Sequence, residues 1–245
     1  MFMNVIIIVL LFVLGLLLLP FLFLFICGLF VDTRKQYDRD SRFFRALLDG
    51  STTIILWCLG VRYVIIGADK FPKSGNFLFI SNHRSNYDPI IQWTVFKKYK
   101  LSFISKKENF RIPMYGRIIH RCCFMPIDRK NPRKAMETVN RAARLLTETG
   151  NSVGVYPEGK RSKECVLLPF HSGMFKIAKK AGKPVVVSTI EGTENIFRNI
   201  KHFRKTVVTI KILETIGADR VSREKPGDLS DYCAAIIKKE LEEQK

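Results

Sequence analysis

The pattern of apolar and polar positions changes sharply near residue 31. Residues 5–31 form an uncharged, almost wholly apolar run, and no face of a helix built from them would be polar. Downstream, short apolar runs bounded by Gly, Pro or polar clusters predict buried strands, whereas apolar side chains at helical spacing predict amphipathic helices. The predicted helices cover residues 41–60, 89–98, 131–150, 170–181 and 228–243. The predicted strands cover residues 61–66, 77–80, 101–104, 122–126, 152–156, 185–190 and 206–213.

This alternation of strands and helices predicts an α/β fold, with a mostly buried mixed sheet flanked by helices and an N-terminal helical membrane-anchoring segment. The division that follows is a membrane-associated helical segment over residues 1–60 and a catalytic domain over residues 61–245. Residues 41–60 mix apolar and polar side chains, as in a helix that lies on a membrane or returns from it, with a candidate break at Gly50-Ser51.

The first apolar run is long enough for a bilayer. Its 27 residues would form a helix of about 40 Å, against a hydrocarbon core of about 30 Å. A secretory signal fits poorly, because the run lacks a basic start and is too long. Whether the run spans the bilayer or bends near Pro20 within one leaflet stays open. Five basic residues follow within residues 34–45 and predict that the later domain faces the cytoplasm at the cell membrane.

Charge and cysteine content narrow the class of partner. The formal net charge is +19, and every charged side chain lies after residue 31, so an anionic partner is expected: a membrane surface, a nucleic acid or a phosphate-bearing substrate. The six cysteines form no C-x-x-C pair, which argues against a zinc site and against a disulfide framework. No metal site is predicted, and the composition fits a reducing compartment.

The strongest chemical signal directly follows the predicted strand at residues 77–80. His83 and Asp88 are five positions apart, which is wrong for one helical face but suits a tight turn that brings the carboxylate back to the imidazole. Such a pair acts as a general base, because the carboxylate fixes the ring tautomer and stabilises the imidazolium. The alternative is that Asp88 only caps a helix beginning at Pro89 and that His83 is an ordinary loop residue.

Two further clusters also follow predicted strands. Arg129 comes after residues 122–127, and a turn at residues 157–162 carries Glu158, Gly159 and Arg161. Arg161 can bind phosphate through paired N–H groups and Lys160 as a point charge, and Gly159 lets the backbone approach a ligand closely. Each cluster alone is also consistent with a solvated surface turn. A fourth segment, residues 168–173, leads into the next predicted helix.

Together these residues resemble the membrane-bound glycerolipid acyltransferases, the lysophosphatidic acid acyltransferase (PlsC-like) family. The family block N-H-x-x-x-x-D matches Asn82, His83 and Asp88, and the block P-E-G-x-R-S matches residues 157–162, with Lys160 in place of the common Thr. The second block, I-P-x-x-G followed by an arginine, matches residues 112–116 and Arg129. The fourth block, at residues 183–188, keeps its first proline and lacks the second.

The resemblance implies transfer of a fatty acyl group from an acyl thioester to the sn-2 hydroxyl of lysophosphatidic acid, giving phosphatidic acid for phospholipid synthesis. It implies that His83 and Asp88 are the catalytic pair, and that Glu158 orients either the acceptor hydroxyl or one of the basic side chains. The implied substrate-binding residues are Lys106, Arg129, Glu158, Gly159, Arg161 and Ser162. Acyl-CoA or acyl carrier protein would be a co-substrate; no bound cofactor and no nucleic acid are expected. Two alternatives stay open: glycerol 3-phosphate or another lysophospholipid as acceptor, and a non-catalytic basic membrane-binding module.

Overall fold

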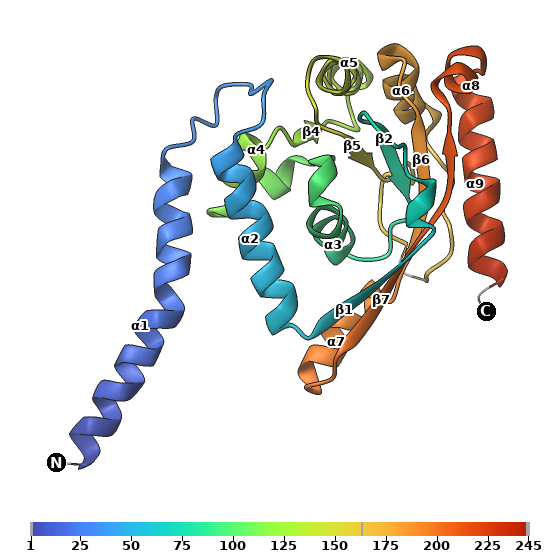
Figure 1. Cartoon of the computed structure of the whole chain (residues 1–245). Coiled ribbons are helices and arrows are strands. Elements are labelled where there is room, and N and C mark those ends of the chain that lie inside the picture. Colours follow the sequence, from blue (N-terminus) through green and yellow to red (C-terminus); the bar gives the residue numbers. More distant parts are fainter. Residues whose placement is uncertain (1, 163, 244–245) are drawn as a thin grey trace.

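The computed structural model describes residues 2–162 and 164–243, without the side chains of residues 2, 3, 9–11, 13, 14, 16 and 17. Seven strands form one sheet in the order β1-β7-β6-β2-β5-β3-β4 (Figure 1). The strands are β1 (Val61–Ile66), β2 (Leu78–Ser81), β3 (Ser102–Lys106), β4 (Met125–Ile127), β5 (Val153–Val155), β6 (Val185–Glu191) and β7 (Thr206–Ile216). The helices are α1 (Phe2–Leu29), α2 (Arg42–Cys58), α3 (Tyr87–Val95), α4 (Tyr115–Arg121), α5 (Pro132–Glu148), α6 (Lys176–Ala181), α7 (Ile196–Lys201), α8 (Ala218–Arg223) and α9 (Pro226–Glu243).

The sheet is mixed because β7 reverses direction. Strands β6, β2, β5, β3 and β4 run parallel, whereas β7 pairs antiparallel with β6 and parallel with β1. The carboxyl ends of the five parallel strands therefore share one end of the sheet, and ligand loops of α/β folds gather at that end. The predicted class, a mixed sheet flanked by helices, is confirmed.

Alternate side chains of the central strand enter two separate cores. Phe77 and Phe79 pack with α3 and α4 on one face, while Leu78 and Ile80 pack with α5, α6 and α9 on the other. All four side chains are fully buried. A strand covered on both faces carries a continuous apolar run, which explains why its sequence does not alternate.

Helix α2 is one continuous helix, so the break expected at Gly50-Ser51 was wrong. Ser41 caps it, and the Ser51 hydroxyl donates to the Leu47 carbonyl within the helix. Arg45 attaches the helix to the sheet: its guanidinium is buried, pairs with Asp40 at 2.7 Å and donates to the Leu101 carbonyl at 2.9 Å.

Helix α1 points away from the domain (Figure 1). Its carboxyl end packs against α4, where the Arg117 guanidinium donates to the Gly28 carbonyl. Taken over the residues that the structure describes, no helix is long and apolar enough to cross a membrane. Part of the predicted anchor, the side chains of residues 9–11, 13, 14, 16 and 17, lies outside the described residues.

Other differences are local. The strand predicted at residues 122–126 begins only at Met125, because Cys122 and Cys123 close helix α4 with N–H groups that donate to carbonyls of that helix. The helix predicted from residue 170 starts as a 3₁₀ turn at Ser172. Helices α4, α7 and α8 are short and were not predicted.

Candidate active site

The predicted His83–Asp88 contact is present at the carboxyl end of β2. The His83 Nδ1 and Asp88 Oδ2 atoms are 2.7 Å apart. Asp88 is fully buried, and the same oxygen accepts the N–H groups of Arg84 at 2.7 Å and Ser85 at 2.8 Å. Its other oxygen accepts the Thr193 hydroxyl. Helix α3 is capped at Asn86, so Asp88 is not its N-cap.

These contacts assign the histidine tautomer. A carboxylate facing Nδ1 requires the proton on that nitrogen, so Nε2 is the basic one. The ring lines a cavity of about 690 Å³, and its side chain is 16% exposed. A buried carboxylate behind a cavity-lining imidazole is the arrangement that general-base catalysis requires.

A stack of aromatic rings holds the imidazole in place. Tyr156 stacks on the His83 ring at a centroid distance of 4.1 Å with 14° between planes, and Phe103 stacks on Tyr156 at 5.5 Å with 15° between planes. The Tyr156 hydroxyl donates to the Gln92 side-chain oxygen at 2.6 Å. Burial raises the pKa of Tyr156 well above its usual range, so the phenol stays a neutral donor.

The loop after β5 is hydrogen-bonded to the backbone of His83. Glu158 Oε1 accepts the His83 N–H at 2.6 Å and Oε2 accepts the Leu168 N–H at 2.9 Å, while the Ser162 N–H donates to the His83 carbonyl at 2.9 Å. Glu158 is buried, and burial raises its pKa to about 7. Glu158 and Ser162 are therefore not among the residues that line the cavity, and their contact with substrate stays a prediction.

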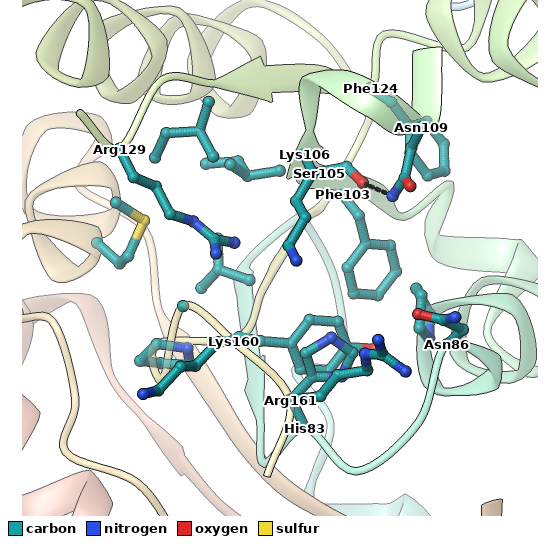
Figure 2. A pocket seen from close by; sticks show the side chains of 18 of the residues that line it. His83, Asn86, Phe103, Ser105, Lys106, Asn109, Phe124, Arg129, Lys160 and Arg161 are labelled. Carbon is teal, nitrogen blue, oxygen red and sulfur yellow. Dashed lines mark hydrogen bonds between the residues drawn. The ribbon is translucent and has the colours of Figure 1, made fainter. Parts of the chain in front are cut away.

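The other predicted binding residues line the cavity. Lys106 ends β3, Arg129 follows β4, and Gly159 and Arg161 follow β5, so all four come from carboxyl ends of parallel strands. Figure 2 shows Lys106 and Arg129 reaching in from one side, opposite the loop that carries Lys160 and Arg161. Gly159 has a φ of +69°, and an added Cβ would lie 2.9 Å from the His171 ring.

The rest of the lining is mainly apolar. Its members come from α3, α4 and the central strands, and include Ile90, Trp93, Phe103, Ile119, Phe124 and Val155. The cavity therefore joins a basic rim, the imidazoles of His83 and His171, and an apolar interior. That combination suits a substrate with an anionic head and a hydrocarbon chain.

Sequence reasoning missed several of the residues around the pair. Tyr156 lies beside the turn at residues 157–162 and His171 lies within the 168–173 segment, and neither had a predicted role. Lys160 was expected to be able to bind phosphate but was not among the predicted binding residues, and it lines the cavity. Thr193 carried no sequence signal. It reaches Asp88 only because β6 lies next to β2.

Comparison with known proteins agrees with this geometry. The family model described as Acyltransferase matches residues 62–191, more than half of the chain. The chain belongs to this acyltransferase family. The match confirms the resemblance drawn from the sequence motifs.

This acyltransferase is similar to several named relatives. It is 27% identical over 169 residues to the 1-acyl-sn-glycerol-3-phosphate acyltransferase of Salmonella typhimurium, covering 69% of this chain and 68% of the relative. The enzyme of that name from Cocos nucifera is 30% identical over 192 residues, covering 78% and 61%. The crystal structure of the 1-acyl-sn-glycerophosphate (LPA) acyltransferase PlsC from Thermotoga maritima has a TM-score of 0.66 at 24% identity, covering 91% of this chain and 87% of that one. The structural likeness shows a shared fold.

Proposed function

We propose that this protein is a 1-acyl-sn-glycerol-3-phosphate acyltransferase, which moves a fatty acyl group from a thioester to the sn-2 hydroxyl of lysophosphatidic acid and forms phosphatidic acid. The observation that carries the proposal is the His83–Asp88 pair opening into a cavity with a basic rim and an apolar interior. Relatives that carry this enzyme name support the choice of acceptor.

The geometry supports direct attack by the acceptor. His83 Nε2 takes the proton of the acceptor hydroxyl as its oxygen attacks the thioester carbonyl, and Asp88 stabilises the imidazolium. Collapse of the tetrahedral intermediate breaks the carbon–sulfur bond, and the imidazolium returns the proton to the leaving thiolate. The products are the new ester, the free thiol and a neutral histidine. No protein nucleophile is needed, and the sequence contains no G-x-S-x-G elbow.

The acceptor phosphate is assigned to the basic rim. Arg129 and Arg161 offer paired N–H donors, and Lys106 adds a point charge on the same side as Arg129. Replacing either arginine with alanine should raise the KM for lysophosphatidic acid. Arg133, exposed on α5, supplies the matched control, R133A. A change confined to the thioester KM would contradict the assignment.

Residues 1–31 are proposed to hold the enzyme at the cell membrane, with the catalytic domain facing the cytoplasm. The support is the uncharged run in the sequence and the exposed apolar side chains of α1, including Phe12, Leu18, Leu19 and Phe21. Lysolipid acceptors reside in the bilayer, and the anionic donor, acyl-CoA or acyl carrier protein, suits the +19 charge.

The deciding experiment uses the purified full chain with both donors and three acceptors: lysophosphatidic acid, glycerol 3-phosphate and lysophosphatidylcholine. Lysophosphatidic acid should give the highest kcat/KM. H83A should lower kcat by about 10²–10⁴-fold, the usual size of a general-base contribution. H120A is the control, because His120 lies outside the cavity lining and its ring contacts the Lys35 carbonyl instead. Near-normal turnover by folded H83A, or preference for another acceptor, would overturn the proposal.

A further inference from the structure

The connection between α7 and β7 places a phenylalanine where glycine is usual. The Arg204 N–H donates to the Asn199 carbonyl at 2.9 Å and the Phe203 N–H to the Ile200 carbonyl at 3.1 Å, the bond pattern of a Schellman motif. The residue after the helix cap in this motif adopts a left-handed backbone. Phe203 has a φ of +52°, a strained value for a bulky side chain.

The Phe203 side chain does not pack against any of the described residues, since the residue is 100% exposed. Glycine would relieve the backbone strain, and a polar residue would be better solvated. Neither local conformation nor packing within the described residues therefore accounts for a phenylalanine at this position. A strained and fully exposed aromatic residue indicates a contact outside the chain.

The charges around Phe203 have one sign. Residues 195–213 contain no Asp or Glu. Four cations, Arg198, Lys201, Arg204 and Lys205, are exposed beside it. We call residues 197–205 the α7–β7 corner. An exposed aromatic tip flanked by Lys and Arg has the chemistry of segments that bind anionic membrane interfaces.

The sheet topology puts this corner at the active-site end. Strand β6 runs parallel to β2, so its carboxyl end, which leads into α7, shares the end of the sheet that carries His83. The Thr206 N–H donates to the Gly60 carbonyl at 3.1 Å, which places the corner beside the end of α2 (Figure 1). Trp57, near that end of α2, is 79% exposed.

We propose that the α7–β7 corner is a membrane contact of the catalytic domain, which inserts Phe203 at the boundary between headgroups and acyl chains of an anionic leaflet. The exposed cations Arg204 and Lys205, which directly follow Phe203 in the chain, bind lipid phosphates beside the ring. The contact orients the active-site end of the sheet toward the bilayer. This inference rests on the proposed lipid substrate for its purpose, but the contact itself can be measured separately.

The test uses the full chain in vesicles of phosphatidylcholine and phosphatidylglycerol, with lysophosphatidic acid either in the vesicles or dispersed in detergent. F203G removes both the ring and the backbone strain. It should therefore raise the melting temperature of the protein and lower kcat/KM about tenfold for lysophosphatidic acid embedded in vesicles. Turnover in detergent should stay unchanged. F203W should keep activity and show quenching by brominated phospholipid beyond the wild-type signal of Trp57 and Trp93.

R204Q/K205Q should weaken the dependence on phosphatidylglycerol, by about fivefold per charge. The charge-matched control K238Q/K239Q changes two exposed lysines on α9. The proposal fails if F203W shows no added quenching, or if F203G lowers turnover equally in vesicles and detergent. It also fails if the only effect of F203G is a change of oligomeric mass in light scattering. That result would mean that the α7–β7 corner contacts a second copy of this chain and not a membrane. Absence of acyl transfer in both media would instead refute the proposed function, while quenching still decides the corner.

Discussion

Glu158 offers the sharpest test of how the site is held together. Two effects oppose each other at this carboxyl group: burial favours the neutral form, and the N–H groups of His83 and Leu168 favour the charged form. Burial dominates, and the pKa rises from the ordinary value of 4.5 to about 7. The perturbation is E158Q, which removes the titration at nearly constant shape.

The shift sets the size and the sign of the effect. A move from 4.5 to about 7 corresponds to about 3 kcal/mol. Between these pH values the folded chain holds a proton that the unfolded chain has lost, so the free energy of unfolding falls as pH rises. The stability contribution is complete below pH 4.5 and is lost by about pH 7. In E158Q the same interval should show no such loss from this position.

The assay is chemical unfolding of detergent-solubilised full-length protein at several pH values between 4.5 and 7.5. The difference between wild type and E158Q is plotted, because other titrating groups are common to both chains. Relative to E158Q, the wild type should lose about 3 kcal/mol of free energy of unfolding as the pH rises across this range. E137Q, at an exposed position on α5, should give a flat difference. A difference that moves in favour of the wild type would show that the two N–H bonds outweigh burial, and would refute the reasoning.

Three further outcomes are expected. In G154A the new Cβ would collide with the Phe103 ring, so the free energy of unfolding should fall by about 1–3 kcal/mol in denaturant titration. Turnover should also slow, because Phe103 stacks on Tyr156 and Tyr156 stacks on His83. An unchanged free energy of unfolding would mean that the ring can move freely. R45A leaves the buried Asp40 carboxylate without its cationic partner, so a loss of about 3–5 kcal/mol in the free energy of unfolding is expected in the same assay. A loss below about 1 kcal/mol would contradict the buried pairing. T193V removes the hydroxyl donor to the Asp88 carboxylate and should lower kcat several-fold, whereas T193S should restore it; equal loss in both variants would exclude the hydroxyl as the cause.

Local patterns predicted the features that depend on local sequence. Strand β1 (Val61–Ile66) has the bounds expected from its apolar run, and the His83–Asp88 contact follows from a turn that spans only five positions. The basic rim was also predictable in part, because strand ends that share a sheet edge bring Arg129 and Arg161 together.

The sequence did not predict features that depend on which elements become neighbours. Glu158 looks like a substrate ligand in sequence, and only the pairing of β2 with β5 shows that it accepts the backbone N–H of His83. The apolar run at residues 122–126 reads as a strand, since periodicity alone cannot distinguish a short strand from the end of a helix. In α2, the tertiary contacts of Arg45 and Leu48 stabilise the helix enough for it to tolerate Gly50.

The position of β2 at the centre of the sheet also governs when the site can form during synthesis. In the described sheet its partners are distant in sequence: Ile80 pairs with Val155, and Ser81 pairs with Ser188. At about 5–20 residues per second, the ribosome needs roughly 5–20 s to reach the partner in β6, Ser188, and roughly 4–15 s to reach the nearer partner in β5, Val155. During that interval residues 77–80, fully buried in the finished protein, have no sheet to join. Variants that weaken the β2–β6 pairing should therefore reduce the yield of folded enzyme more than the activity of the molecules that do fold.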